Sequence, residues 1–251
     1  MKPKVSFLIP TKNRAKYIKD CLDSLIDQEV KEWEAIVVND HGNDETKKIV
    51  DNMSDERIKF FELNDYHGYG VSCARNFAAL NARADLIAVA DSDDINYPNR
   101  LTVTLKAFEE EPTADIFYAH LDVWEEEKNL IRERKTPFTP FNLEVYKKKN
   151  YIPHVTIAMK RKILLDNPYN SFFRVAEDYE LISRLAVSGK KFIYKNIKVV
   201  KYRIGKQNIS IGGQNEGLVK KYGSLVGMVR GWQPFDKTIL GRIDAMEKGK
   251  K

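Results

Sequence analysis

Short runs of apolar residues alternate with helical patterns through the first half of the chain. Strand-length apolar runs lie at 5–10, 35–38, 58–63 and 86–90. Between them, apolar side chains recur at three- and four-residue spacing, as at Ile18, Cys21, Leu22 and Leu25, which is the period of an α-helix. This alternation predicts βα units built around a mainly parallel sheet with helices packed against it.

The second half of the chain has a less regular pattern. Strands are predicted at 115–123 and 192–202, and a helix is predicted at 177–188, where Gly189 ends it. The charged, proline-bearing stretch 125–140 predicts an exposed loop. Beyond Gly205 the periodicity fades while lysines increase. We therefore expect one α/β domain over 1–210, followed by a variable, helical and basic extension over 211–251.

The composition is typical of a soluble globular protein, with 43% hydrophobic and 31% charged residues. A formal net charge of +6 favours an anionic partner, such as a sugar nucleotide, a nucleic acid or a lipid headgroup. No apolar run has the length of a membrane span, and the apolar stretch near the start is too short for a signal peptide. Cys21 and Cys73 lack metal-binding spacing, so we expect buried thiols in a cytoplasmic protein, peripheral to a membrane at most.

The clearest candidate for chemistry is the acidic segment Asp91-Ser92-Asp93-Asp94, which directly follows the apolar run 86–90. Ligands of open α/β sheets bind beyond the carboxyl ends of the strands, where this segment is expected to lie. Carboxylates crowded together repel one another unless a cation holds them, and hard oxygen ligands suit Mg²⁺ or Mn²⁺. Taken alone, the motif is explained equally well as a solvated acidic turn.

Further segments occur with it in a fixed order, and together they resemble the family 2 glycosyltransferases of the GT-A fold. The resemblance covers roughly the first four-fifths of the chain and rests on 5–14 (VSFLIPTKNR), 37–44 (VVNDHGND), 70–76 (GVSCARN), 91–94 (DSDD) and 177–178 (ED). It implies a GT-A fold, which is Rossmann-like, with a nucleotide-sugar-binding half over 1–97 and an acceptor-binding half over 98–210. The acceptor itself is not implied by these segments.

The resemblance also implies a donor site for a nucleotide diphosphate sugar. The contacts that it implies are Pro10, Thr11, Asn13, Arg14, Asp40, Arg75, Asp91, Ser92 and Asp93. A carboxylate at Asp40 can accept the imide N–H of uracil, which favours a UDP-sugar. Asp93, with Asp91 on the ribose or the metal, would hold Mn²⁺ or Mg²⁺ against the departing diphosphate.

The acidic pair Glu177-Asp178 matches the segment that supplies the catalytic base in inverting members of this family. Asp178 would take the proton from an acceptor hydroxyl while that oxygen attacks the anomeric carbon, and a positioned base contributes about 10²–10⁴-fold in rate. A single displacement inverts the anomeric configuration. Without the resemblance, an acidic first turn is explained more simply by its favourable interaction with the helix dipole.

The chain departs from the family pattern in the late segment 202–210, which lacks a histidine often found there. Arg203 or Lys206 is therefore a candidate to neutralise the diphosphate. Asp94 and His154 are further candidates for acceptor or diphosphate contacts, although a structural role is the simpler interpretation of His154.

Two questions stay open at this point. The acceptor is either a cell-surface glycan or lipid-linked saccharide, approached with the basic segment 218–246 on an anionic membrane, or a modified nucleic-acid base. Two other classes of protein compete with the transferase. A sugar-nucleotide nucleotidyltransferase would normally carry a Gly-rich loop after its first strand, and a non-catalytic nucleotide-sugar-binding module would not need Asp178 together with Asp93.

Overall fold

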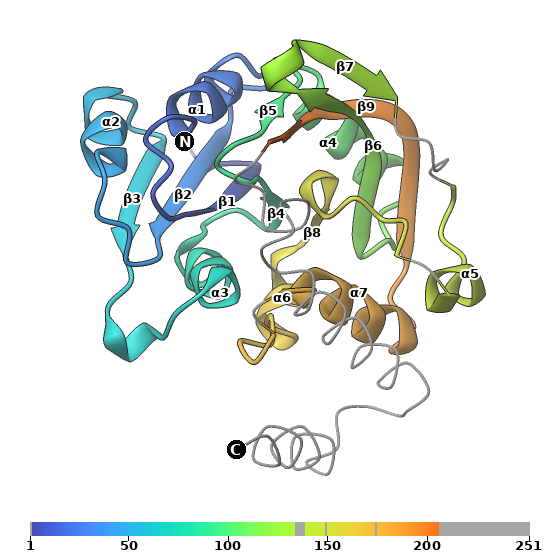
Figure 1. Ribbon diagram of the computed structural model, residues 1–251. Coiled ribbons are helices and arrows are strands. Elements are labelled where there is room, and N and C mark those ends of the chain that lie inside the picture. Colours follow the sequence, from blue (N-terminus) through green and yellow to red (C-terminus); the bar gives the residue numbers. More distant parts are fainter. Residues whose placement is uncertain (1, 134–138, 149, 174, 206–251) are drawn as a thin grey trace, which may run out of the picture.

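The computed structural model describes residues 2–133, 139–148, 150–173 and 175–205. Its centre is one mixed β-sheet with the strand order β3-β2-β1-β4-β8-β6-β9-β5, and β7 pairs with β6 (Figure 1). The strands are β1 (Val5–Thr11), β2 (Trp33–Asn39), β3 (Ile58–Glu62), β4 (Leu86–Val89), β5 (Ile95–Asn96), β6 (Ile116–Glu125), β7 (Leu130–Glu133), β8 (Ala158–Lys160) and β9 (Phe192–Ile204). The predicted strands of the first half are therefore confirmed within one or two residues.

The first-half strands form the parallel part of the sheet. β1 runs parallel to both β2 and β4, and β2 runs parallel to β3. Both faces of β1 are covered: Phe7 and Ile9 belong to one core cluster and Leu8 to the other. This burial on both sides explains why the strand reads as a continuous apolar run rather than an alternating one.

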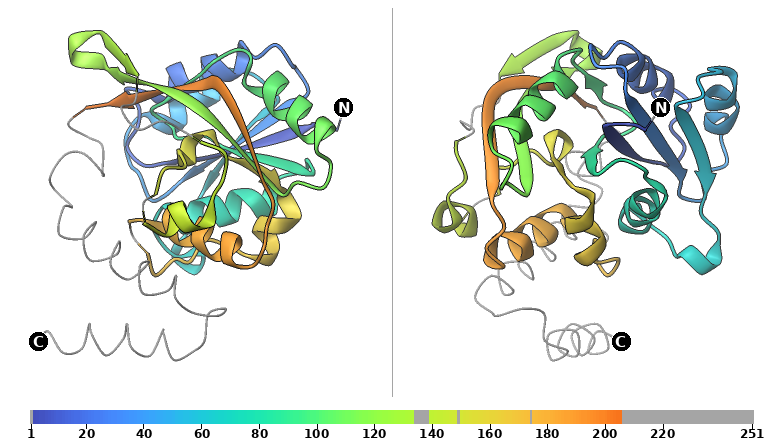
Figure 2. Two further views of the ribbon diagram at one scale, coloured as in Figure 1. Left: turned by 90° about the vertical axis from the view of Figure 1, so that its right-hand side faces the viewer. Right: turned by 180° about the vertical axis from the view of Figure 1, so that it is seen from behind.

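Helices cover the two faces of the sheet (Figures 1 and 2). The core on one face includes apolar residues of α1 (Ile18–Ile26), α2 (Thr46–Asn52) and α4 (Arg100–Glu110). The core on the other includes residues of α3 (Val71–Asn81), α5 (Leu143–Lys148), α6 (Arg161–Asp166) and α7 (Glu177–Val187). Short 3₁₀ turns η1 (Asp65–His67), η2 (Glu126–Lys128) and η3 (His154–Thr156) lie in the connections. The predicted α/β architecture is thus confirmed.

The second half adds antiparallel pairing to the sheet. β8 lies antiparallel to both β4 and β6, whereas β6 and β9 run parallel over almost their whole length, with a register shift around His120. The predicted loop over 125–140 is in part a hairpin, because η2 and Asn129 turn the chain back and β7 pairs with β6. Asn129 tolerates the left-handed backbone (φ 45°) that this turn requires.

None of the helices within the described residues is long and apolar enough to cross a membrane. The expected basic extension, including the segment 218–246 considered for membrane or nucleic-acid contact, lies outside the described residues, as does Lys206.

A buried carboxylate ties the strands together at the amino end of the sheet. Glu34 of β2 is 1% exposed; its Oε1 accepts hydrogen bonds from Ser6 Oγ (2.6 Å) and the Arg83 backbone N–H (2.7 Å), and its Oε2 from Arg83 Nε (2.6 Å). Burial raises the pKa of Glu34, but these hydrogen bonds outweigh it, so the pKa lies below its ordinary value of 4.5. The donors thus join β1, β2 and the turn before β4.

We expect Glu34→Ala to lower the free energy of unfolding by about 2 kcal/mol at neutral pH, because it leaves Ser6 and Arg83 without their acceptor. A group with a lowered pKa stabilises the fold above its ordinary pKa, and this contribution is lost as the pH falls through the folded-state value. Urea denaturation of both proteins should therefore show a difference that shrinks in acid. Glu56→Ala, at an exposed position, should stay within about 0.5 kcal/mol of the wild type. A pH-independent difference would contradict the ionised network.

Candidate active site

The carboxyl ends of β1, β2 and β4 open into a cavity of about 1050 Å³. The segments after these strands meet the first turns of α3 and α7 there, as expected for a ligand site of an α/β sheet. Of the residues singled out from the sequence, those lining the cavity are Pro10, Thr11, Arg14, Asp40, Arg75, Asp91, Ser92, Asp93, His154, Glu177 and Asp178. Residues from distant parts of the chain are thus brought to one place.

The buried guanidinium of Arg75 lies between the two acidic segments of this cavity. Its Nη1 donates to Glu177 Oε1 (2.7 Å) and its Nη2 to Asp91 Oδ1 (2.9 Å), while the Arg75 side chain is 4% exposed. The guanidinium also lies 5.5 Å from the centre of the Tyr169 ring. Burial acts to lower the pKa of Arg75, but Asp91 and Glu177 outweigh it and raise the pKa above its ordinary value, so the group stays charged. Arg75 therefore braces the end of β4 against the start of α7.

Arg203 supports the acidic turn from behind. Its backbone N–H donates to Asp94 Oδ1 (2.8 Å) and its Nε donates to the Asp93 carbonyl (2.7 Å). The guanidinium also bonds to Glu126 and Asp20 and lies over the rings of Tyr17 and Trp124. Arg203 is 3% exposed and Asp94 is 2% exposed. Against the expectation of a diphosphate contact, Arg203 is placed where it positions the acidic turn, because this buried pocket of acceptors and rings holds its guanidinium.

Carboxylates crowd the centre of the cavity and the turn beside it, and the pKa values of three of them are raised. Burial, followed by the neighbouring Asp91 charge, raises the pKa of Asp93. Burial, followed by Asp93, raises the pKa of Asp94 well above its ordinary value. Burial, followed by the Glu177 charge, raises the pKa of Asp178 to about 7. The site thus has an unfavourable excess of negative charge that a bound cation would relieve.

The donor set suits a hard divalent cation only in part. The Asp93 Oδ2 oxygen lies 3.6 Å from Arg14 Nε, and Asp91 shares its Oδ1 with Arg75. Within the described residues, no group of three or more His, Cys, Asp or Glu side chains is arranged to hold a metal by itself. Mg²⁺ and Mn²⁺ commonly use one or two carboxylates and complete their shell with substrate phosphates and water. Asp91 and Asp93 fit an ion of that kind.

Asp40 defines the other end of the cavity. Its Oδ1 accepts the Gly70 backbone N–H (3.0 Å) and lies 3.2 Å from His41 Nδ1, while its Oδ2 lies 3.7 Å from Lys12 Nζ. The nearby Thr11 Oγ1 is buried and has no hydrogen-bond partner within the described part of the chain. Asp40 and Thr11 both line the cavity, so their side-chain oxygens are available to hydrogen-bond a ligand there.

Asn13, which was expected to contact the nucleotide, is exposed and is not among the residues that line the cavity. Its Oδ1 accepts the Asn43 backbone N–H (2.8 Å), and its backbone is left-handed with φ 53°. Asn13 thereby joins the loop after β1 to the loop after β2. Lys12 and Tyr69, which the sequence did not single out, do line the cavity.

His154 has a structural partner in the cavity wall. Its Nε2 lies 2.7 Å from the Tyr169 hydroxyl, and burial, followed by the nearby Arg75 charge, lowers the pKa of His154 well below its ordinary value. The neutral imidazole therefore holds Tyr169, which lies under Arg75. The wall around it is apolar and was missed from the sequence because its residues come from four separate segments; they include Leu121, Val123, Ile152, Val155, Phe173, Val175 and Ile204.

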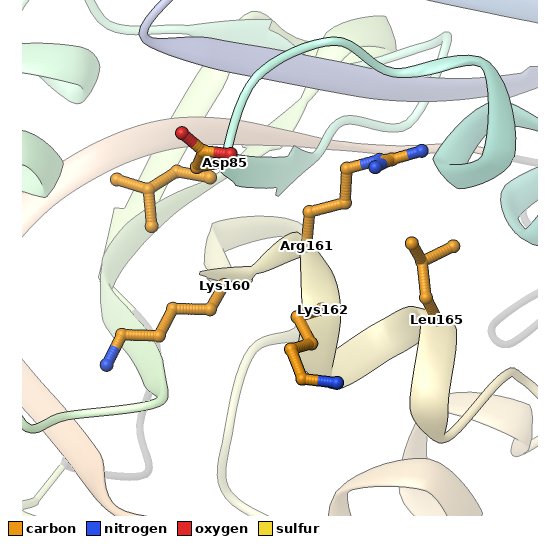
Figure 3. A pocket seen from close by; sticks show the side chains of 6 residues that line it. Asp85, Lys160, Arg161, Lys162 and Leu165 are labelled. Carbon is orange, nitrogen blue, oxygen red and sulfur yellow. The ribbon is translucent and has the colours of Figure 1, made fainter.

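A smaller pocket of about 390 Å³ lies at the amino end of β4, away from this cavity (Figure 3). Its basic side chains already have partners: Lys160 Nζ donates to the Pro112 carbonyl (2.9 Å), Lys162 pairs with Asp166 (2.8 Å), and Arg161 donates to the carbonyls of Ala79 and Leu80. Arg161 thus satisfies carbonyls that the end of α3 leaves unpaired. We assign this pocket no ligand.

Comparison with known proteins agrees with this fold and shows the family of the chain. The model of the family "Glycosyl transferase family 2" matches residues 6–167, which is more than half of the chain. An uncharacterised glycosyltransferase of Methanocaldococcus jannaschii is 30% identical over 210 residues, covering 81% of this chain and 71% of the relative. The GalNAc(5)-diNAcBac-PP-undecaprenol β-1,3-glucosyltransferase of Campylobacter jejuni is 27% identical over 229 residues, covering 88% and 71%.

Two solved structures share the fold. S. aureus TarS 1-349 in complex with UDP-GlcNAc has a TM-score of 0.72 at 19% identity, covering 90% of this chain and 66% of that one. The mannosyltransferase PcManGT from Pyrobaculum calidifontis, in complex with GDP-Man and Mn²⁺, has a TM-score of 0.62 at 17% identity, covering 83% and 59%. The chain therefore spans less than two thirds of these two structures.

The fold is that of the GT-A glycosyltransferases. The chain belongs to glycosyltransferase family 2. The expectations of family, fold class and enzyme class are confirmed.

Removal of the Arg75 charge should destabilise the protein. We expect Arg75→Met to lower the free energy of unfolding by about 3 kcal/mol, because Asp91 and Glu177 lose their buried counter-charge. Adding Glu177→Gln to this variant should recover part of the loss, since one of the two uncompensated charges disappears. Chemical denaturation of the single and double variants measures the coupling. Arg132→Met removes a half-exposed partner of Glu125 and should cost less than about 1 kcal/mol. If Arg75→Met and Arg132→Met lose the same free energy of unfolding, Arg75 does not hold the two acidic segments together.

Proposed function

We propose that this glycosyltransferase transfers a sugar from a uridine diphosphate sugar to an acceptor hydroxyl with inversion of configuration, using a divalent metal at Asp91 and Asp93 and Asp178 as the base. The observation that carries the proposal is the convergence of Asp40, Asp93 and Asp178 on one cavity. These three carboxylates have different surroundings: one Asp40 oxygen accepts the Gly70 N–H, Asp93 is half-buried in the acidic turn, and Asp178 lies in the first turn of α7.

The hydrogen bonds of Asp40 favour uracil over guanine. Its Oδ1 already accepts the Gly70 N–H and lies beside His41, which leaves Oδ2 for a ligand. Uracil presents one N–H between two carbonyls, so it needs one carboxylate oxygen, and Lys12 beside Oδ2 can donate to a carbonyl. Guanine presents two adjacent N–H groups and would need both oxygens. The UDP-GlcNAc complex of TarS is consistent with a uridine donor, whereas the GDP-Man complex of PcManGT shows that the fold also accommodates guanosine.

Asp93 and Asp91 would hold the divalent ion at the diphosphate end of the donor. The ion, when bound, neutralises charge that develops on the leaving diphosphate. Arg14, 3.6 Å from Asp93, lines the same part of the cavity and is a second positive group available to the phosphates. Arg203 and Asp94 keep the acidic turn in place from behind.

Asp178 is suited to accept a proton from the acceptor. A pKa of about 7 lets its carboxylate bind a proton near neutral pH without being protonated permanently. As the acceptor O–H proton passes to Asp178, the acceptor oxygen bonds to the anomeric carbon and the bond from that carbon to the diphosphate breaks. Ala176, just before α7, has a left-handed backbone (φ 60°), a strained conformation of the kind found where a side chain must be aimed at a site.

The acceptor is proposed to be a saccharide. The Campylobacter jejuni relative carries an undecaprenol-linked saccharide in its name, which supports a glycan or lipid-linked acceptor over a nucleic-acid base. The apolar wall formed by Leu121, Val155 and Phe173 offers no charged side chain to a phosphate backbone. A nucleotidyltransferase or a non-catalytic binding module would not need an acidic side chain at Asp178, so its position in the cavity favours the transferase.

A thermal-unfolding screen with nucleotides, each with and without Mn²⁺, tests the donor and metal proposals. UDP and its sugars should stabilise the protein more when Mn²⁺ is present, by about 2.7 kcal/mol at a hundredfold excess over the dissociation constant. Asp93→Asn should lose the Mn²⁺ dependence, and Asp40→Asn should lose most of the UDP effect. Equal stabilisation by GDP would overturn the uridine assignment, and no stabilisation by any nucleotide would overturn the donor site.

The pH dependence of turnover tests the base. Because Asp178 must be deprotonated to act, kcat/KM should rise with pH and level off above about 7. Asp178→Asn should lower kcat by at least about 100-fold, while Asp51→Asn, an exposed position on α2, should leave it unchanged.

The raised pKa of Asp178 also predicts that the stability of the metal-free protein depends on pH. Its folded pKa is raised, so its contribution is present below the ordinary value of 3.8 and is lost as the pH rises through about 7. Asp178→Asn should therefore gain stability relative to the wild type across that range.

In the turnover assay, near-native activity of Asp178→Asn would rule out the role of Asp178 as the base.

A further inference from the structure

An aromatic pair stands at the Asp40 end of the cavity. The ring of Tyr69 stacks on the imidazole of His41, with ring centres 4.1 Å apart and planes inclined by 22°. Tyr69 lines the cavity and is 55% exposed, although His41 covers one of its faces. Within the described part of the chain, the ring is therefore covered on the His41 side and open to the cavity on the other, where a ligand can contact it.

The orientation of this ring is held by its surroundings. The Tyr69 hydroxyl hydrogen-bonds to Asp65 Oδ1, and the residue lies between Gly68 (φ 77°) and Gly70 (φ 97°). These backbone angles are readily adopted by glycine, so the chain can turn sharply on either side of the tyrosine. A ring held in this way loses little conformational freedom when a ligand binds.

Asp40 joins the aromatic pair to the base-recognition site. Its Oδ1 accepts the N–H of Gly70, which directly follows Tyr69, and lies 3.2 Å from Nδ1 of His41, the ring beneath Tyr69. The carboxylate proposed to read the base and the ring beside it are therefore parts of one hydrogen-bonded unit. A flat ligand that reaches Asp40 Oδ2 would pass alongside the open face of Tyr69.

We propose that Tyr69 is the platform on which the donor's base stacks, with His41 supporting it from behind. The inference rests on the proposed uridine nucleotide donor and adds the residue that supplies affinity for the base. Every base has a π-face, so stacking contributes affinity while the hydrogen bonds of Asp40 contribute selectivity. The sugar and diphosphate bind elsewhere in the cavity and should not depend on this ring.

The same loop provides a matched control. Tyr66 is 97% exposed, is not among the residues that line the cavity, and lies three positions before Tyr69. A tyrosine-to-alanine change at either position removes the same atoms from the same loop, but only Tyr69 faces the proposed base site.

Isothermal titration of UDP, with Mn²⁺ present, tests the platform. Tyr69→Ala should raise the Kd for UDP by about 5- to 100-fold, as expected for the loss of one base–aromatic stack. Tyr69→Phe keeps the ring and should stay within about threefold of the wild type, and Tyr66→Ala should bind UDP like the wild type. Titration with pyrophosphate and Mn²⁺, which lacks a base, should give the same Kd for the wild type and Tyr69→Ala.

The outcomes separate this inference from the proposed function. If Tyr69→Ala binds UDP like the wild type while Asp40→Asn and Asp93→Asn bind it weakly, the platform is wrong and the uridine donor stands. If Tyr69→Ala weakens pyrophosphate as much as UDP, the change disturbs the loop as a whole and the platform is again wrong. If the folded wild type does not bind UDP at all, the proposed donor fails and the inference fails with it.

Discussion

The ion pairs of the buried Arg75 guanidinium set the separation of the two acidic segments on which the site depends. Asp91 follows β4 and Glu177 opens α7, and the guanidinium bonds to both. Asp93 lies two residues beyond the first contact, and Asp178 directly follows the second. In the proposed reaction, the metal-binding turn and the proton acceptor would thus be positioned through one side chain, which also supplies the positive charge that offsets these crowded carboxylates.

Charge is distributed unevenly along the cavity, and each region suits one part of the proposed reaction. Lys12 and Arg14 line the part of the cavity proposed for the donor, the carboxylates occupy the centre, and apolar residues such as Val155 and Phe173 form the wall proposed for the acceptor. Burial raises the pKa of Asp93, of Asp94 and of Asp178. For Asp178, burial followed by the Glu177 charge brings the pKa to about 7, within the range useful to a base.

Arg203, near the end of β9, holds the acidic turn in position. Arg203 binds the carbonyl of Asp93 and, through its backbone N–H, the carboxylate of Asp94, while Tyr17 and Trp124 enclose its guanidinium. The acidic turn is consequently supported on both sides, by Arg75 at Asp91 and by Arg203 behind Asp93. Such support matters because a metal or phosphate ligand displaced by 1 Å loses much of its effect on a transition state.

The sequence by itself determined the βα units of the first half and the acidic segment at the end of β4, because strand length, helical period and strand ends are local properties. Motif order also identified most of the charged residues that line the cavity, including Asp40 and Arg75. Only the tertiary structure decided which way the late residues face: Arg203 contacts Asp93 from 110 positions away, and the apolar wall combines residues of β6, β9 and the segments between them. Contacts across such separations depend on how the sheet and helices pack, which no local pattern of the chain encodes.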